Sequence, residues 1–368
     1  MALMCRWRSR PQHQFPPLAL QKQRFSEAPY RSGKCGKRSA GNMWRHTVQS
    51  FHWLTRAVAK MANEFRTLES HSAEYFGDTR DYWWNRDFLE LMAKRLSFDR
   101  VREVLDVGCG VGHWGQLLIN VLPTAARVQG VDRDHGWVEH AVARASARGL
   151  ANRVAYQVAD AERVPFADAS FDLVTCQTVL IHTADPGAAI AEMVRVARPG
   201  GLILAAEPNN IAGTLILSSL NFHAPVDDLV TGVRFQLICE RGKAALGEGN
   251  NSIGDLVPGL FAEIGLIDVR VYLNDKTNVL IPPYDTREQR AMLEELSDTA
   301  NRDFWNWSRK DTHRYFLAGG GREDEFDALW SAATGDGDSN KFKKAIADCT
   351  YSSSGAAIQY LVAGRKAE

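Results

Sequence analysis

The sequence predicts an α/β fold in which a parallel sheet is covered by helices on both faces. Two observations carry this prediction. From Arg102 onward, short apolar runs alternate with helical patterns of roughly 10 to 15 residues, and parallel strands require such crossover helices. A glycine-rich turn, VLDVGCGVGHWG at 104–115, joins the first apolar run directly to the first helical pattern. A strand, a tight turn and a helix start in this order are typical of a nucleotide-type binding turn.

The elements of the sheet follow in chain order. The predicted strands cover 103–107, 127–131, 153–158, 171–177 and LILAAE at 202–207. The predicted helices cover about 113–122, about 135–148 and the stretch up to Val196. Asp185 and Pro186 have the residue types of an N-cap and a first-turn proline for that last helix, and the glycines of RPGG at 198–201 end it.

The alternation is interrupted twice, at about 208–254 and at about 274–354. Between the interruptions, 255–264 predicts a helix and 267–273 a strand, and the chain closes with a strand at 357–366. The interruptions are too long for plain loops. We therefore expect helical cap insertions over the ligand edge of the sheet, with residues 101–368 as one domain.

Two segments precede this domain. Residues 61–100 predict an N-terminal helical lid with a dense aromatic patch, and Tyr75, Tyr82 or Trp84 could shield a bound ligand, although most of the patch is expected to be core. Residues 1–60 hold 12 Lys or Arg against the single acidic Glu27. We expect a disordered basic tail or a start assigned upstream of Met61, with an organelle transit peptide as the alternative.

Charge and cysteine usage exclude several classes of function. The chain has 44 basic and 44 acidic side chains, but without the tail 32 basic face 43 acidic residues, a net charge of about −11. An acidic body argues against a duplex nucleic-acid partner. The six cysteines are scattered without a C-x-x-C pair, which indicates neither a zinc site nor a disulfide framework, so no metal is expected. No run is long and apolar enough to span a membrane, and a cytoplasmic location is expected.

The glycine turn fits two cofactors, and one carboxylate separates them. Gly110, Gly112 and Gly115 spell the dinucleotide fingerprint, and Asp132 lies at a suitable distance for a ribose hydroxyl. Asp106, however, places a carboxylate at the carboxyl end of the first strand. A carboxylate repels a pyrophosphate but suits an α-ammonium, so S-adenosylmethionine (SAM) fits better than NAD.

Polar residues follow the other strands at the same predicted edge. Asp132 could accept both ribose hydroxyls, and Asp160 the exocyclic amine of an adenine whose ring nitrogen faces the Ala161 N–H. Gln177 ends the fourth strand, near where a methionine part would lie. Any one acidic strand end could be an ordinary helix N-cap, but three at one edge behind a glycine turn favour a ligand site.

This set of motifs resembles the catalytic core of class I SAM-dependent methyltransferases, especially the branch of ubiquinone and menaquinone biosynthesis enzymes. The matching segments are LDVGCGVG (105–112), GVDRD (130–134), ADAERVPFADASFDLV (159–174), QTVLIH (177–182), EMVRVARPGGLIL (192–204), AEP (206–208) and QYLVAGRK (359–366).

The resemblance implies a Rossmann-like, doubly wound, seven-stranded sheet whose last strand is antiparallel. It places Asp106, Gly108 and Gly110 at the methionine end of SAM, Asp132 at the ribose, and Asp160 and Ala161 at the adenine.

The reaction implied is an in-line displacement at a sulfonium methyl, which needs proximity and a dry pocket more than a nucleophilic side chain. If the acceptor is a hydroxyl, His182 and Glu207 are the candidate general bases, with a purely structural histidine as the alternative for His182. Asn209 and Asn210 could orient a substrate or form a plain turn.

Four functions remain open at this point. The first is a methyltransferase that acts on O, N or C of a small molecule, favoured by the acidic body and the long cap. The second is an RNA or protein methyltransferase, for which the basic tail is the only support. The third is a SAM-binding regulator without catalysis. The fourth, least favoured, is an NAD-dependent oxidoreductase.

Overall fold

The computed structural model describes residues 78–301, 305–334, 339–355 and 358–368. By its internal contacts the chain divides into residues 1–68 and 69–368, and the description below concerns the second unit. The predicted basic tail and the predicted lid residue Tyr75 lie outside the described residues.

Seven strands form the central sheet, in the order β3-β2-β1-β4-β5-β9-β6. Strand β9 is antiparallel to both of its neighbours, and the pairs β2–β3, β1–β2, β1–β4 and β4–β5 are parallel. This confirms the predicted seven-stranded sheet with an antiparallel last strand. The strands are β1 (Glu103–Val107), β2 (Arg127–Asp132), β3 (Val154–Val158), β4 (Phe171–Gln177), β5 (Ala197–Asn209), β6 (Ile267–Leu273) and β9 (Ile358–Arg365).

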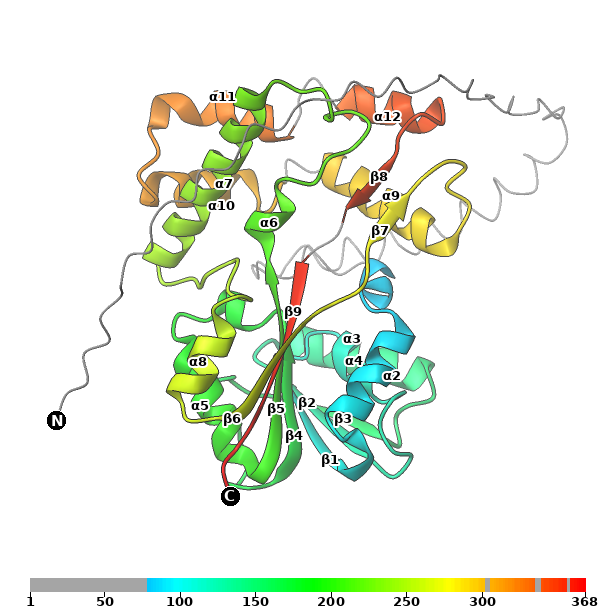
Figure 1. Ribbon diagram of the computed structural model, residues 1–368, viewed down its shortest axis with the longest axis vertical. Helices are drawn as coiled ribbons and strands as arrows, with labels where there is room; N and C mark the ends of the chain where they lie inside the picture. Colours follow the sequence, from blue (N-terminus) through cyan, green and yellow to red (C-terminus); the bar gives the residue numbers. More distant parts are fainter. Residues whose placement is uncertain (1–77, 302–304, 335–338, 356–357) are drawn as a thin grey trace, which may run out of the picture. The chain divides into compact units, whose positions relative to one another are not determined.

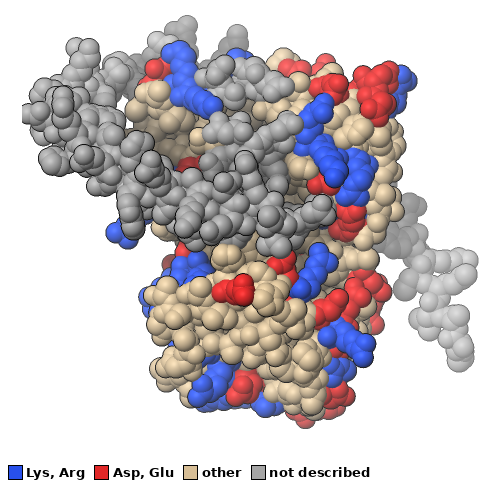
Figure 2. Space-filling view, turned by 180° about the vertical axis from the view of Figure 1, so that it is seen from behind, with Lys and Arg blue, Asp and Glu red and all other residues tan. Residues whose placement is uncertain are grey.

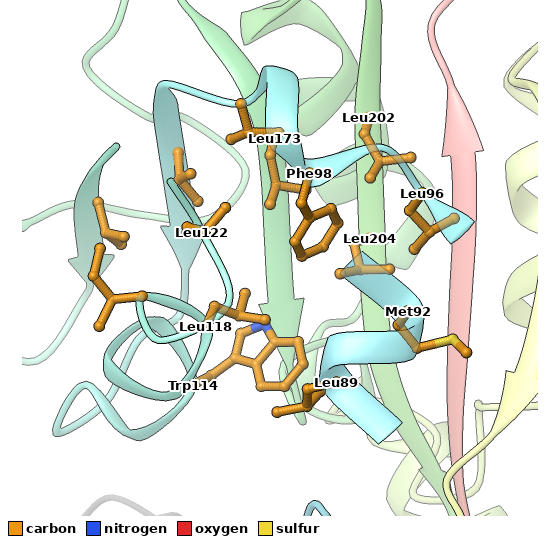
Figure 3. Close-up of a cluster of buried hydrophobic side chains, with 14 of the residues drawn as sticks. Leu89, Met92, Leu96, Phe98, Trp114, Leu118, Leu122, Leu173, Leu202 and Leu204 are labelled. Carbon is orange, nitrogen blue, oxygen red and sulfur yellow. The ribbon is translucent and has the colours of Figure 1, made fainter. Parts of the chain in front are cut away.

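Helices cover both faces of this sheet (Figure 1). On one face lie α2 (Arg86–Arg95), α3 (His113–Leu118) and α4 (His135–Ala147), and on the other α5 (Pro186–Val196) and α8 (Val257–Glu263). Successive strand residues supply opposite faces, so Leu173 joins the first core cluster and Val174 the second. Figure 3 shows the first cluster, in which side chains of α2 and α3 meet leucines of β4 and β5.

Side-chain caps define the starts of two helices on the sheet. The carboxylate of Asp134 accepts the N–H of Trp137 at the start of α4, at 3.1 Å. The carboxylate of Asp185 accepts the N–H of Ala188 at the start of α5, at 2.9 Å, with Pro186 in the first turn. The predicted cap and proline of α5 are therefore confirmed.

Residues 210–254 and 274–355, which we call the cap, add a further core. The cap contains α6 (Asn210–Gly213), α7 (Val226–Ala245), β7 (Asn278–Leu280), α9 (Arg287–Asn301), α10 (Arg309–Ala318), α11 (Glu323–Thr334), α12 (Ser339–Ala347) and β8 (Ser353–Gly355). Aromatic side chains from α7, α10 and α11 pack together, among them Phe235, Phe316 and Phe326. Since this cluster excludes water from its own apolar surface, the cap does not depend on the sheet for all of its stability.

The structure differs from the predicted elements in three places. Strand β5 begins at Ala197 instead of residue 202, because the RPGG segment continues the strand with Gly200 at a positive φ. The β7–β8 pair was not predicted, since each strand has three residues and pairs across more than 70 positions. Trp84, considered for the lid, is 5% exposed and packs on Phe88 and Trp114, so it belongs to the core.

Candidate functional site

The turn between β1 and α3 is built on glycines in the left-handed backbone region. The angle φ is 64° at Gly108, 50° at Gly110 and 79° at Gly112. A Cβ at Gly108 would lie 2.4 Å from a methyl carbon of Val179, and a Cβ at Gly112 would lie 2.4 Å from the hydroxyl oxygen of Tyr156. Residues larger than glycine fit neither the backbone conformation nor the space at these positions. The turn therefore presents backbone atoms without side chains there.

Asp106 is the buried carboxylate of this site, with only 1% of its surface exposed. Its Oδ2 accepts the N–H of Gly115 at 2.9 Å. Its Oδ1 is equally buried and has no hydrogen-bond partner among the residues that the structure describes. Burial raises the pKa of Asp106 to about 7, against the opposing effect of the Gly115 N–H. A buried carboxylate oxygen that receives no hydrogen bond lowers the stability of the fold. Such an oxygen is expected where a hydrogen-bond donor of a ligand fills the missing place.

Asp132 ends β2 and ties the glycine turn to the second strand. Its Oδ2 accepts the N–H of Gly110 at 2.8 Å, and its Oδ1 accepts the N–H of Asp134 at 3.0 Å. Burial raises its pKa. Each carboxylate oxygen has two lone pairs, so both can still accept a donor from a ligand.

The parallel register brings the predicted ligand-binding residues to one edge of the sheet. Val107 of β1 lies beside Val131 of β2 and Cys176 of β4, so the residues that follow them emerge at the same edge. The residues assembled in this way are Asp106, Gly108, Gly110, Asp132, Asp160, Ala161 and Gln177.

The residues beyond β3 and β4 differ in burial. Asp160 is exposed, and its Oδ1 accepts the N–H of Glu162 at 2.9 Å. Ala161 is half-buried against the second core cluster, and Gln177 is half-buried at the last position of β4. Asp160 is thus open to solvent, whereas Asp106 is enclosed.

Glu207 near the end of β5 is fully buried, which differs from the expectation that it faces an open site as a general base. Its Oε1 accepts the N–H groups of Val179 at 2.9 Å and of Leu180 at 3.0 Å, and its Oε2 accepts that of Ile181 at 3.3 Å. Burial raises its pKa to about 7. Both carboxylate oxygens accept backbone N–H groups at the start of the single turn η5 (Leu180–His182). The carboxylate therefore stabilises this backbone and does not face a methyl acceptor.

The remaining predicted residues lie close to this turn. His182 is exposed at the last position of η5. Asn209 accepts the N–H of Ala212 at 3.1 Å as the N-cap of α6, and the side-chain amide of Asn210 donates to the carbonyl of Asn251 at 2.6 Å. The two asparagines therefore form the turn that was the alternative to a substrate contact.

An ionic cluster next to the glycine turn was not predicted from the sequence. The carboxylate of Asp81, in η3 (Asp78–Tyr82), lies 2.9 Å from His113 and also pairs with Arg144 of α4 and with Arg148 at the C-cap of that helix. Burial acts against ionisation, but His113 and the two arginines hold the pKa of Asp81 below its usual range. Burial, together with the charge of Arg144, lowers the pKa of His113 to about 4. His113 directly follows the glycine turn, a local signal that could have singled it out, whereas no local pattern points to Asp81.

Comparisons with known proteins find methyltransferases. The family model for the methyltransferase domain matches residues 105–205. The methyltransferase GfsG of Streptomyces halstedii is 38% identical over 118 residues, which is 32% of this chain and 42% of that protein. The ubiquinone/menaquinone biosynthesis C-methyltransferase UbiE of Geotalea daltonii is 27% identical over 154 residues, 42% of this chain and 65% of that protein. The crystal structure of YcgJ from Bacillus subtilis aligns with 77% of this chain and all of its own, at 19% identity and a TM-score of 0.43.

The chain spans less than two thirds of the length of either curated relative. The matched segment nevertheless runs from β1 into β5, and it holds the glycine turn and the carboxylates Asp106, Asp132 and Asp160. Residues 105–205 are therefore similar to a methyltransferase domain, and the curated relatives that align with this segment are methyltransferases.

Proposed function

We propose that this chain transfers a methyl group from SAM to an oxygen, nitrogen or carbon atom of a small-molecule acceptor. The observation that carries the proposal is Asp106, a buried carboxylate beside the glycine turn with one oxygen that no described residue satisfies. An α-ammonium group supplies the charge and the hydrogen-bond donors that this oxygen lacks. A pyrophosphate would be repelled by it, which disfavours NAD.

The other residues at this edge also fit SAM. Gly108 and Gly110 would leave room for the methionine end, with Gln177 beside it at the end of β4. Asp132 would accept the ribose hydroxyls through the lone pairs that its two backbone contacts leave. Asp160 and the N–H of Ala161, beyond β3, would meet the adenine.

The chemistry divides between cofactor and protein. Bound SAM supplies an electrophilic methyl group together with its leaving group. The residues of the chain contribute alignment and exclusion of water. Glu207 acts as a positioning residue, because it holds the backbone of η5. His182, exposed at the end of this turn, is our candidate for taking the proton of a hydroxyl acceptor.

The surface charge supports a small acceptor over a duplex nucleic acid. Residues 61–368 carry a net charge of about −11. On the face shown in Figure 2, basic and acidic side chains of the described residues are interspersed. Where the described residues are visible in this view, Lys and Arg are not gathered into the continuous basic face that a nucleic-acid partner requires. The name of the related UbiE, a quinone-biosynthesis methyltransferase, is compatible with a small acceptor.

The cap contains a pocket that could contribute to acceptor selection. It is a shallow depression that is open to solvent, and Leu217, Phe222 and Ile281 line it together with Ser218 and Ser352. Such a lining suits a molecule with an apolar body and a hydroxyl or carbonyl group. Among the described residues, no helix has both the length and the apolar character to cross a bilayer.

Calorimetry with SAM and with NADH tests the cofactor, and a screen of acceptors tests the transfer. We expect SAM to bind and NADH not to bind. Quinols, phenols, amines and sterol-like lipids would then be offered with SAM while the release of S-adenosylhomocysteine is followed. Tight binding of NADH without binding of SAM would contradict the proposal. SAM binding without turnover of any acceptor class would favour a SAM-binding regulator.

A further inference from the structure

The turn η5 is held by buried charges from two sides. Beneath it, the carboxylate of Glu207 accepts the backbone N–H groups of residues 179, 180 and 181. From the cap, the ammonium of Lys243 on α7 donates to the carbonyl oxygen of Ile181 at 2.7 Å. The N–H groups of the turn thus meet a negative group and its carbonyl meets a positive one.

Lys243 is placed for this contact by its surroundings. It is 2% exposed, and its second hydrogen bond runs to Oδ1 of Asn251 at 3.3 Å. Burial lowers its pKa to about 8, and the charges of Glu240, Glu248 and Glu207 act in the opposite direction. Most of the population therefore keeps its proton at pH 7, and a buried ammonium is costly unless it is paired in this way.

The chain that follows α7 closes against the same turn. Gly249 has a φ of 92°, and a Cβ built on it would lie 2.3 Å from the carbonyl oxygen of Ile181. Only a glycine allows this approach. The backbone after α7 and the ammonium of Lys243 therefore meet η5 at one carbonyl, which fixes where the cap meets the sheet edge.

On its other side, η5 contacts the glycine turn. Val179 directly precedes η5, and its methyl carbons fill the space where a Cβ of Gly108 would lie. The N–H of Val179 is one of those that Glu207 accepts. A shift of η5 would therefore move the side chain that packs against the turn between β1 and α3.

We propose that Lys243 is a positioning residue of the cofactor site, which holds the carbonyl of Ile181 and thereby keeps Val179 packed against Gly108. The proposal rests on the proposed function, since it assumes that SAM occupies the glycine turn. Lys243 acts through its contacts with the backbone and not by contact with SAM or the methyl acceptor. It links the cap to the cofactor turn through one hydrogen-bonded turn of backbone.

The test compares Lys243→Met with Cys239→Ala in the full chain. Methionine keeps the length of the side chain but removes the charge and the donors. Cys239 is a fully buried residue one turn earlier on α7, and it contacts Thr312 of α10, not η5. Two quantities are measured: hydrogen exchange of the segment 178–183 without ligand, and the Kd for SAM by calorimetry.

We expect Lys243→Met to speed exchange of residues 179–181 at least tenfold and to raise the Kd for SAM about fivefold. Cys239→Ala should lower the melting temperature yet leave both quantities within twofold of the wild type. If Lys243→Met changes neither quantity, or only as much as Cys239→Ala does, the proposal is wrong.

Two further outcomes are separable. If the wild type does not bind SAM, the proposed function fails, while the exchange comparison still decides whether Lys243 holds η5. If Lys243→Met does not fold, Lys243→Gln replaces it, because the amide keeps a polar group at this buried position while its shorter, uncharged side chain weakens the contact with the carbonyl of Ile181. Faster exchange at 179–181 in that variant supports the proposal, and unchanged exchange overturns it.

Discussion

The carboxyl ends of β1 and β5 each bear a buried carboxylate, and the two differ in what surrounds them. Asp106 receives one backbone N–H and has a second oxygen without a partner among the described residues. Glu207 receives three backbone N–H groups on its two oxygens. Burial raises the pKa of both to about 7. Burial and a shifted pKa therefore do not distinguish the carboxylate that we propose binds SAM from the one that does not, whereas the count of internal donors separates the two.

The largest effect is expected when the carboxylate of Glu207 is removed. Glu207→Ala would leave three buried N–H groups without an acceptor, so we expect the free energy of unfolding to fall by about 3–5 kcal/mol. Urea denaturation followed by circular dichroism measures this. The matched variant is Asp106→Ala, for which the loss should stay below about 1.5 kcal/mol because a single backbone N–H loses its acceptor. Equal losses in the free energy of unfolding would mean that the two carboxylates contribute equally to stability, which contradicts the difference drawn between them.

The ligand-binding carboxylate should show its effect in cofactor affinity. Asp106→Asn removes the charge that would pair with the α-ammonium of SAM, and we expect binding to weaken by about 1–3 kcal/mol. Calorimetry with SAM gives the value. Glu162→Gln, an exposed acidic position beside the same edge, serves as the control and should bind like the wild type. Unchanged affinity in Asp106→Asn would place the cofactor elsewhere.

The pH dependence of SAM binding tests whether the ionised carboxylate of Asp106 binds the cofactor. With a pKa of about 7, Asp106 is largely protonated at pH 6 and largely ionised at pH 7.5. Only the ionised form attracts an ammonium, so affinity should rise with pH, by roughly tenfold over this interval. The interval stays below the α-amino pKa of about 7.7–8.0, so most of that group stays charged, and its partial loss of charge would act against the rise. The same titration on Asp106→Asn should be flat, and an equal slope in both proteins would assign the dependence to another group.

The smallest effect is expected at Asp160, which follows the edge strand β3. Asp160→Ala removes an exposed carboxylate that water can replace as an acceptor, so SAM binding should weaken by less than about 1 kcal/mol. Competition between SAM and S-adenosylhomocysteine resolves a change of this size. An effect as large as that of Asp106→Asn would show that solvent does not compete at the adenine end.

Local sequence was sufficient for the parts of this site that depend on near neighbours. The glycine turn, the strands that precede Asp106 and Gln177, and the cap of α5 at Asp185 were all predicted at or near their observed positions. Strand and helix periodicity, turn chemistry and capping act over a few residues, so they leave a readable pattern. The order of the sheet came from the resemblance, because pattern alone does not tell which strands become neighbours.

The roles of buried charges were decided by tertiary structure. Glu207 was predicted to face the site because β5 is central, but its partners lie 26 to 28 residues away in a turn with no pattern of its own. The contact of Lys243 with Ile181 spans 62 residues, and that of Asp81 with Arg144 spans 63.

The sequence by itself determined where the backbone turns and which polar residues end the strands. Only the tertiary structure decided which of these side chains find internal donors and which stay open to a ligand. The physical reason is that a buried charge must be paired by whatever group the fold brings to it, and that group is chosen by chain segments far apart in sequence.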